Sequence, residues 1–441
     1  MRSLRSRVLC LLCLPLAVVA CCSSSGGGAD AGPDAGVAAA DAGDGGFCTQ
    51  EGQSCIAVND CCDPTDSCSP AAGYVCAPIF ATDAGPDGGS PDAGPDGGPD
   101  AGLGDGGPGD GGVDAGSPWR AEPVLGGLDV IVALSVPATG VPVAAGTGSG
   151  VGGVLARQGG ASPSWLLASG TPPAAGLFGV WTDPAGDLFA AGQGDGGSAV
   201  LFGGSVDGGF ALEPNGGAQI LFSVFGLSAV EALAVGVDAS GGAALALHLE
   251  PDGGLLLESL PQGIVRLLRV QGAATGGAIA ALGADSQGSP QILSRADGGW
   301  TELPAPSGAK QLSDLAFGPA GDLLVVGDDG AGNGLAYRWT GGGFVPLDLS
   351  QLPGVPKLRA VLELAAGEIY LAAGGTDPNS FLSTTPEILH LVQGSWSIES
   401  LPPSALDVTS LGGGGAAGLF AAGRQTCQGC PSAPLILRRS P

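Results

Sequence analysis

The sequence predicts an all-β protein whose main part is a seven-bladed β-propeller of four-stranded blades. A short apolar run ending in glycine occurs seven times, and the glycines are spaced by 46, 44, 47, 44, 47 and 49 residues. A fixed period of this size is typical of an array of one supersecondary unit, and four short strands per unit are typical of a propeller blade. The seven glycines are Gly146, Gly192, Gly236, Gly283, Gly327, Gly374 and Gly423.

The repeat around Gly236 shows the strands that we expect in each blade. The pair Asp252-Gly253 separates its last two apolar runs, and Asp-Gly suits the positive φ angles of a tight hairpin turn. Alternating apolar runs and turn residues therefore predict four antiparallel strands in this repeat. The four runs are 221–225, 232–236, 244–249 and 255–260.

The two ends of the repeat array predict how the ring closes. The last repeat stops after its third strand at 435–439, and the segment 117–123 before the first repeat resembles the fourth-strand sequence at 299–304. We therefore expect the N-terminal strand to complete the last blade. Closure of this kind removes two exposed strand edges, which are aggregation hazards.

The sequence predicts five parts in order. Two of these parts, a tether and a linker, consist mainly of Gly, Ala, Pro, Ser and Asp. Such segments cannot bury enough apolar surface to offset the entropy of ordering. The parts are a signal peptide at 1–20, a disordered acidic Gly/Ala/Asp tether at 21–46, a small cysteine-rich module at 47–77, a disordered Asp/Gly/Pro linker at 78–117 and the propeller at 118–441.

The first 21 residues follow the order basic, apolar, small and cysteine. Three arginines precede the apolar run 8–19, which is too short to span a bilayer, and Val18-Val19-Ala20-Cys21 ends it. The segment resembles the lipobox of bacterial lipoproteins. The resemblance implies that Cys21 is acylated and anchors the protein, and Cys22 after it implies the outer membrane or cell surface of a Gram-negative bacterium. An ordinary signal peptide is the alternative.

Six cysteines lie within the module at 47–77, with the spacing C-x6-C-x5-C-C-x5-C-x7-C. An even number in a short exported segment predicts a disulfide framework, for which 15 pairings are possible. The adjacent pair in the middle resembles the knottin pattern, and some knottins are toxins or protease inhibitors. A protease-resistant bead on a tether is the simpler interpretation. The knottin resemblance implies the pairs Cys48–Cys62, Cys55–Cys68 and Cys61–Cys76.

Few residues of the propeller predict chemistry. The formal net charge of −27 argues against nucleic acid as a partner, because binding to phosphates needs cationic contacts. The two histidines, His248 and His390, fall in third strands, where we expect structural roles. No catalytic motif, metal site or cofactor site is expected, and the C-x-x-C pair Cys427 and Cys430 predicts a disulfide that braces a loop.

One acidic pattern suggests a ligand-binding face. The loop between the second and third strands carries aspartate in five consecutive repeats, and in a propeller all these loops emerge on one face. An acidic ring would suit a cation or a basic partner, although aspartate is also a common turn residue. The candidates are Asp195, Asp238, Asp285, Asp328, Asp329 and Asp377. Four charged residues near first strands, Arg266, Arg269, Asp314 and Arg359, could instead line the central channel.

The expected function is binding and not catalysis. Segments 183–189 and 318–324 resemble NHL- and kelch-like propeller repeats, and this resemblance implies the fold without an activity. We expect a monomeric, lipid-anchored envelope or surface protein that contacts the membrane through its anchor. Its propeller loop face would contact a protein or glycan as a binding or scaffold module. A propeller-type glycan-active hydrolase or lyase and an envelope-assembly scaffold are the alternatives.

Overall fold

The structure, a computed structural model, divides into two compact units, 1–103 and 104–441. It describes the hairpin strands β1 (Asp66–Ser69) and β2 (Val75–Pro78) in the first unit. In the second unit it describes 117–440 except 149–150, 172–173, 214, 216, 241, 274–276, 377–382 and 428–429. No helix in these described segments is long and apolar enough to cross a membrane.

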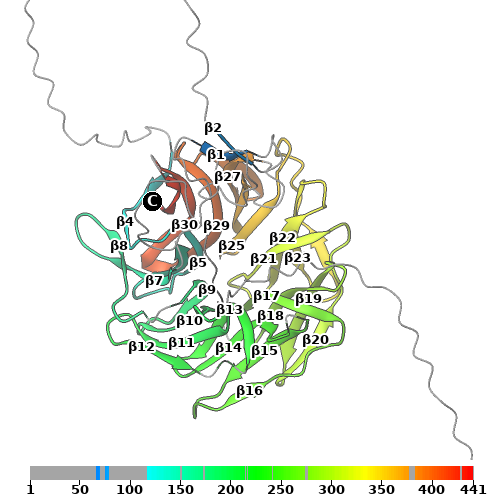
Figure 1. Ribbon diagram of the computed structural model, residues 1–441. Helices are drawn as coiled ribbons and strands as arrows, with labels where there is room; N and C mark the ends of the chain where they lie inside the picture. The colour runs from blue at the N-terminus through cyan, green and yellow to red at the C-terminus, as the bar shows by residue number, and fades with distance from the viewer. Residues whose placement is uncertain are drawn as a thin grey trace, which may run out of the picture. The chain divides into compact units, whose positions relative to one another are not determined.

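Seven sheets are arranged around a common centre, so the predicted seven-bladed propeller is confirmed (Figure 1). Blade 1 holds β5 (Val130–Ser135), β6 (Val143–Gly148), β7 (Val151–Gln158) and β8 (Ser164–Leu167). Blades 2 and 3 hold β9 (Gly176–Thr182), β10 (Asp187–Gln193), β11 (Ala199–Ser205), β12 (Gly209–Glu213), β13 (Ala218–Ser228), β14 (Glu231–Asp238), β15 (Ala244–Leu249) and β16 (Leu255–Leu257). Blades 4 and 5 hold β17 (Ile264–Gly272), β18 (Ile279–Asp285), β19 (Pro290–Ala296), β20 (Gly299–Leu303), β21 (Gln311–Phe317), β22 (Leu323–Asp328), β23 (Gly334–Trp339) and β24 (Phe344–Pro346). Blades 6 and 7 hold β25 (Leu358–Ala365), β26 (Glu368–Thr376), β27 (Ser383–Val392), β28 (Ser395–Glu399), β29 (Ala405–Gly414), the 3-10 turn η3 (Gly415–Ala417), β30 (Gly418–Cys427), β31 (Cys430–Arg439) and β3 (Trp119–Ala121).

The ring closes as predicted, through an N-terminal strand in the last blade. Strand β3 pairs antiparallel with β31, with Trp119 opposite Arg439. The chain then crosses to blade 1, where β4 (Val124–Leu125) pairs parallel with β8. Blade 1 therefore has β4 as a fifth strand beside the four that were predicted. The segment that closes the ring thus pairs with both neighbouring blades.

The glycine that ends each apolar run is required by a close approach of two strands. Near this glycine the pairing of the first strand with the second strand shifts its register. In blade 3, a Cβ on Gly236 would collide with the main-chain oxygen of Ile220. The same collision with a first-strand oxygen occurs in blades 1, 2, 4, 5 and 7. In blade 6, Gly374 has a φ of 73°, which a residue with a side chain rarely adopts. The repeat glycine therefore marks the point where a bulged inner strand passes the second strand.

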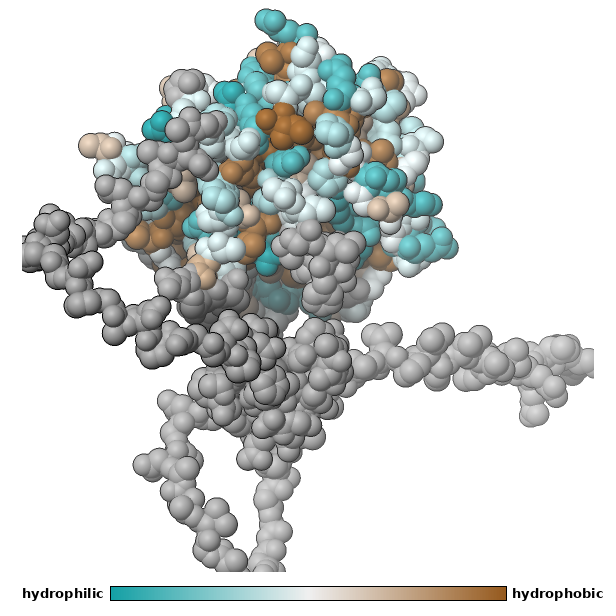
Figure 2. Space-filling view, turned by 90° about the horizontal axis from the view of Figure 1, so that it is seen from above, coloured by the Kyte–Doolittle hydropathy of each residue, from teal (hydrophilic) through white to brown (hydrophobic). Residues whose placement is uncertain are grey.

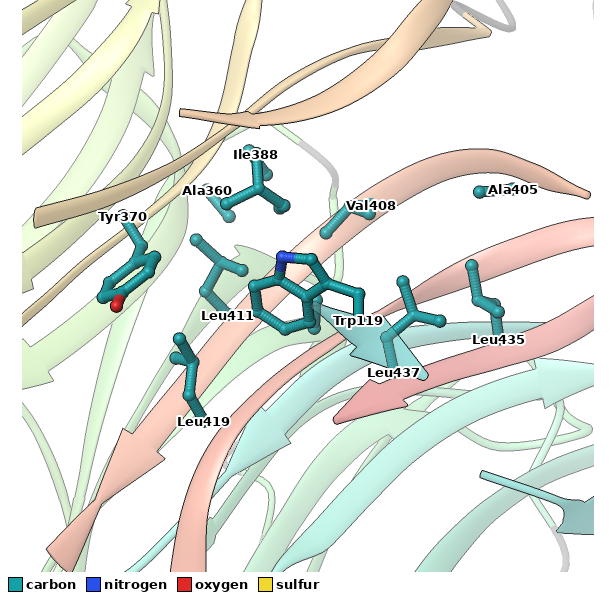
Figure 3. Packing of buried hydrophobic residues seen from close by; sticks show 12 residues of the cluster. Trp119, Ala360, Tyr370, Ile388, Ala405, Val408, Leu411, Leu419, Leu435 and Leu437 are labelled. Carbon is teal, nitrogen blue, oxygen red and sulfur yellow. The ribbon is translucent and has the colours of Figure 1, made fainter. Parts of the chain in front are cut away.

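The core lies between neighbouring blades. Seven clusters of buried apolar residues each join two adjacent blades. Between blades 6 and 7, Trp119 of β3 lies among Leu411, Leu437 and Val408 (Figure 3). Trp119 is 2% exposed, so the closing strand contributes to the core as well as to the sheet.

The outer strands carry single exposed apolar residues. Leu125, Leu212 and Leu257 are each more than half exposed, and each lies on the outer strand of a different blade. Apolar and polar residues lie side by side over the face shown in Figure 2. Scattered apolar residues of this kind are common on soluble proteins.

A Trp–Glu–Arg triad joins neighbouring blades at three interfaces. In the triad at the seam, the Trp119 Nε1 donates to a Glu399 Oε2 at 2.8 Å, and Arg439 Nη2 lies 2.7 Å from Glu399 Oε1. Glutamate comes from the outer edge of one blade, whereas tryptophan and arginine are cross-strand partners in the next blade. The other triads are Trp165, Glu122 and Arg157 between blades 7 and 1, and Trp300, Glu258 and Arg295 between blades 3 and 4.

The described contacts at the other four interfaces hold no such triad. In the two triads beside β3 the glutamate lies three residues after the outer-strand tryptophan of its own blade, as Glu122 follows Trp119, whereas Glu258 lies three residues after Leu255. Where the next blade has a phenylalanine, the glutamate position is apolar: Leu303 packs with Phe344 in one cluster. Two of the three triads flank the closing strand β3.

Strands β30 and β31 continue well past the repeat glycine Gly423, to Cys427 and from Cys430. Arg424 pairs with Pro434 and Gln425 with Ala433, so β30 and β31 extend as a hairpin beyond the other second and third strands. The same hairpin places Cys427 opposite Cys430 in register. The strand extension is favoured here by an ion pair at its base, between Arg424 Nε and Asp407 Oδ2 at 2.7 Å.

Candidate functional site

A cavity of about 740 Å³ lies at one end of the central channel. Its lining comes from the carboxyl-terminal halves of all seven innermost strands and from the hairpins that follow them. This cavity is large enough for a peptide side chain or a small ligand, because ligand pockets commonly span about 300–1,000 Å³. The candidate site is therefore the end of the channel next to the hairpins that join the first and second strands of the blades.

Aromatic and aliphatic side chains form much of the cavity wall. Trp181 and Phe225 lie on neighbouring inner strands with ring centroids 6.3 Å apart in an edge-to-face arrangement. Phe317 and Leu362 line the same cavity from blades 5 and 6. Walls of this kind bind apolar faces of a ligand and leave orientation to a few polar groups.

One ion pair faces the cavity. Arg269 of β17 and Asp314 of β21 lie with Nε and Oδ1 3.6 Å apart, and their side chains are 23% and 14% exposed. Asp314 Oδ2 also accepts a hydrogen bond from the Val361 amide of the next blade at 3.1 Å. Burial raises the pKa of Asp314 to about 6, although the nearby Arg269 favours its ionised form. A carboxyl that titrates near neutral pH in a cavity is typical of functional sites.

Both members of this pair occupy one repeated position. The position follows the bulge of the first strand, and it holds Ser223 in blade 3 and Ser410 in blade 7. Each serine Oγ accepts a hydrogen bond from an amide of the next blade, as Asp314 does. Asp314 therefore keeps the repeated inter-blade bond and adds a charge that Arg269 faces.

The sequence suggested both residues as lining of the channel, but not that they share one repeated position and form a pair. This position lies 13 residues before the repeat glycine for Asp314 and 14 residues before it for Arg269. Of the four charged residues suggested for the channel, these two line the cavity. Arg266 is exposed and outside it, and Arg359 Nε donates to the Gly374 carbonyl at 2.7 Å.

The aspartates predicted as a ligand face lie at the opposite end of the inner strands. Asp238 is the register partner of Ala218 at the start of β13, whereas the cavity is lined by the end of that strand. Asp238 Oδ1 accepts hydrogen bonds from the Gly242 and Ala243 amides of its own turn. A hydrogen bond from the Ser240 hydroxyl, together with these amides, lowers the pKa of Asp238. Its carboxylate is therefore used to fix the turn.

Two further aspartates of this set fix their own turns in the same way. Asp285 Oδ1 accepts from the Gln287 and Ser289 amides, and Asp329 Oδ1 accepts from the Ala331 and Asn333 amides. The Ser289 amide is the main cause that lowers the pKa of Asp285, and a hydrogen bond from the Asn333 side chain is the main cause that lowers the pKa of Asp329. Turn formation is thus the role that the observed contacts support for this pattern.

The other members of the set differ from one another. Asp328 is buried, accepts from the Gly330 amide and lies 3.2 Å from Lys357 Nζ, whereas Asp195 is exposed. Asp377 lies outside the described residues. Among the described residues, no group of three or more His, Cys, Asp or Glu side chains could hold a metal ion.

Most predicted cysteine sites lie outside the described residues, including Cys21, Cys48, Cys55, Cys61 and Cys62. The backbone of the first unit places Cys68 opposite Cys76 across the β1–β2 hairpin. The lipidation and the disulfide pairings stay predictions.

Both histidines pack between charged groups of the blades. His248 Nε2 lies 2.8 Å from Glu231 Oε1, and His390 stacks on Tyr370 with ring centroids 4.2 Å apart. His390 Nδ1 also lies 3.1 Å from Glu399 Oε1, which belongs to the seam triad. These contacts support the structural roles expected for both residues.

Comparison with known proteins identifies the fold. No protein-family model and no curated protein sequence matches the chain. A streptogramin B lyase aligns with a TM-score of 0.55 and 14% identity, covering 72% of this chain and 96% of the lyase. YCF48 bound to a peptide aligns with a TM-score of 0.52 and 13% identity, covering 74% and 97%. The WD40 propeller domain of Doa1 aligns with a TM-score of 0.50 and 11% identity, covering 73% and 97%.

The chain is a seven-bladed β-propeller. At these identities the similarity shows the fold alone, because one fold carries many unrelated functions.

The raised pKa of Asp314 predicts how stability depends on pH. In the unfolded chain this carboxyl releases its proton near pH 3.8, and in the folded protein near pH 6. Between these values the folded state holds the proton more tightly, so stability falls as pH rises, and the loss is complete above about pH 6. Asp314→Asn keeps an acceptor for the Val361 amide but removes the charge. We expect it to gain stability over the wild type as pH rises from 4 to 7, by up to about 3 kcal/mol.

Urea denaturation at several pH values measures this difference directly. Subtracting the wild-type curve from that of Asp314→Asn removes the contribution of the other carboxyls. A difference that stays constant from pH 4 to 7 would contradict the burial of an ionised Asp314.

Proposed function

We propose that the protein is a non-enzymatic binding module of the cell envelope that takes a segment of a protein or glycan into its channel cavity. The observation that carries this proposal is the aromatic cavity at the end of the central channel, where the pair Arg269 and Asp314 faces a ligand. Aromatic side chains supply contact area, and a charged pair supplies orientation.

Two other acidic residues line the cavity, and one carboxylate oxygen of each already accepts two hydrogen bonds. Asp183 Oδ1 accepts from the Ala185 and Asp187 amides, both at 2.9 Å. Glu363 Oε1 accepts from Arg338 Nη2 at 3.0 Å and from the Gly367 amide at 2.8 Å. Recognition would therefore centre on Arg269 and Asp314. The neighbour YCF48, whose structure holds a peptide, supports a peptide as one class of ligand.

A glycan-active hydrolase or lyase is the second candidate. The pKa of Asp314, raised to about 6 by burial, favours it, because a carboxyl with such a pKa can accept and return a proton near neutral pH. The similar fold of a streptogramin B lyase supports a propeller as a scaffold for a lyase. An envelope-assembly scaffold would use the same cavity without turnover.

Anchoring is the second part of the proposal. Cys21 would carry the acyl chains, and the tether and linker would hold the propeller away from an outer membrane or cell surface. The order of basic, apolar and small residues before Cys21 supports it. Incorporation of labelled palmitate into the wild type, and its loss in Cys21→Ser, would be the expected result.

Binding to a glycan array and to a displayed peptide library tests the cavity. We expect Arg269→Gln, combined with Asp314→Asn to keep the site neutral, to weaken binding by about tenfold or more through loss of a charged hydrogen bond. The matched control is Arg266→Gln, which removes an exposed arginine from the same strand β17.

Variants at the other end of the channel separate the two candidate faces. If Asp238→Asn and Asp285→Asn weaken binding and the cavity variants do not, the aspartate loops form the site. Turnover of any glycan on the array, abolished by Asp314→Asn, would favour the enzyme.

A further inference from the structure

A hollow of about 460 Å³ lies between blades 7 and 1, at the outer edge of the ring and apart from the channel. It is lined by Arg120 of the closing strand β3, by Arg438 and Ser440 at the end of the chain, and by Ser162 of the β7–β8 hairpin. The walls therefore come from the two ends of the propeller and from the blade that follows the seam.

Two arginines occupy opposite positions on the paired strands of this seam, and the guanidinium of Arg438 lies beside Gly418 of β30. Arg120 and Arg438 are direct partners in the β3–β31 register. Like charges directly opposite each other destabilise a strand pair unless something neutralises them. Within the described part of the chain, neither arginine forms an ion pair, and the Nε of Arg438 is buried without a hydrogen-bond partner. A buried donor of this kind costs free energy until an acceptor reaches it.

The nearby acidic groups are bound elsewhere. Glu122 also lines the hollow, but its Oε1 accepts from Arg157 Nη2 at 2.7 Å and its Oε2 accepts from Trp165 Nε1 at 2.9 Å. Arg439 lines it too and is bound to Glu399. The hollow is therefore locally positive in a chain with 15 basic and 42 acidic residues.

We propose that this hollow binds a phosphate group, held between Arg120 and Arg438. Guanidinium groups bind phosphate oxygens through paired hydrogen bonds, and the hydroxyls of Ser162 and Ser440 are further donors at the rim. A phosphate bound there would contact both β3 and β31. It would neutralise the two arginines and stabilise the closed ring. The group could belong to free phosphate or to a lipid headgroup, and the recognition chemistry is the same.

Inorganic phosphate is the probe for the site itself. Calorimetric titration and thermal unfolding of the full chain with Cys21→Ser are compared in phosphate and in chloride at equal ionic strength. We expect phosphate to bind and to raise the Tm, and the variant Arg120→Gln/Arg438→Gln to weaken binding by about tenfold or more. Arg266→Gln is the matched control and should bind phosphate as the parent does.

The same variants identify the source of the phosphate. Co-sedimentation with phosphatidylglycerol vesicles that depends on Arg120 and Arg438 would support a lipid headgroup, and phosphate binding without vesicle binding would support a soluble ligand. Absence of phosphate binding by the parent chain, or equal binding by the double variant, would overturn the proposal.

Discussion

Deletion of residues 118–125 is expected to lower the Tm of the propeller by at least about 15 °C. The deletion removes β3 and β4, and with them the pairing of the closing segment with blades 7 and 1. It also removes the buried ring of Trp119, and loss of a buried tryptophan alone costs about 3–5 kcal/mol. Both seam triads lose a member, because Trp119 and Glu122 lie in this segment. Thermal unfolding followed by near-ultraviolet circular dichroism measures the effect.

A deletion of equal length in the linker is the control. Removing residues 105–112 shortens the chain before the seam and leaves β3 and β4 intact, so its Tm should match that of the wild type. If both deletions give the same Tm, the ring does not depend on its N-terminal strand.

Glu122→Ala is expected to destabilise the protein by about 3–5 kcal/mol, because removing one partner of a buried ion pair leaves the other charge uncompensated. The side chains of Glu122 and Arg157 are only 7% and 15% exposed. The Trp165 Nε1 would lose its acceptor as well. The hydrogen bond between the Arg157 guanidinium and Glu122 raises the pKa of Arg157. Chemical denaturation measures the change in free energy of unfolding.

The chain offers a matched control at the equivalent position of another blade. Glu213 follows Phe210 by three residues, as Glu122 follows Trp119, but the next blade has Leu255 where a tryptophan would stand. Among the described contacts, Glu213 makes no ion pair. Glu213→Ala should therefore change the stability by less than about 0.5 kcal/mol. Equal effects of the two substitutions would show that the triad contributes nothing specific.

The repeated backbone could be predicted from sequence because local signals encode it. The glycine after each apolar run is required wherever a first-strand carbonyl approaches it, so its spacing reports every blade. The missing fourth strand of the last repeat likewise predicted β3. The extra strand β4 was missed because Val124 and Leu125 have no turn or period to mark them. Their pairing depends on where the chain crosses to blade 1.

The sites were harder to predict because they depend on contacts between blades. Asp238 and Asp285 were prominent in the sequence because their turns recur, and that recurrence reflects turn formation. Arg269 and Asp314 could be suggested as channel residues from their place near first strands, but their pairing could not, since the same position holds serine in other blades. The Trp–Glu–Arg triads join residues as far apart as Trp119 and Arg439, and only the closed ring brings them together.

Native-state hydrogen exchange at the seam tests the account most directly. The Glu122 amide donates to the Ile436 carbonyl at 2.9 Å, and the Ser440 amide donates to the Pro118 carbonyl at 2.8 Å. If β3 closes the ring, these two amides should exchange as slowly as the amides within β30, through opening of the whole propeller. Exchange of both at the rate of unprotected amides, while β30 stays protected, would contradict closure by the N-terminal strand.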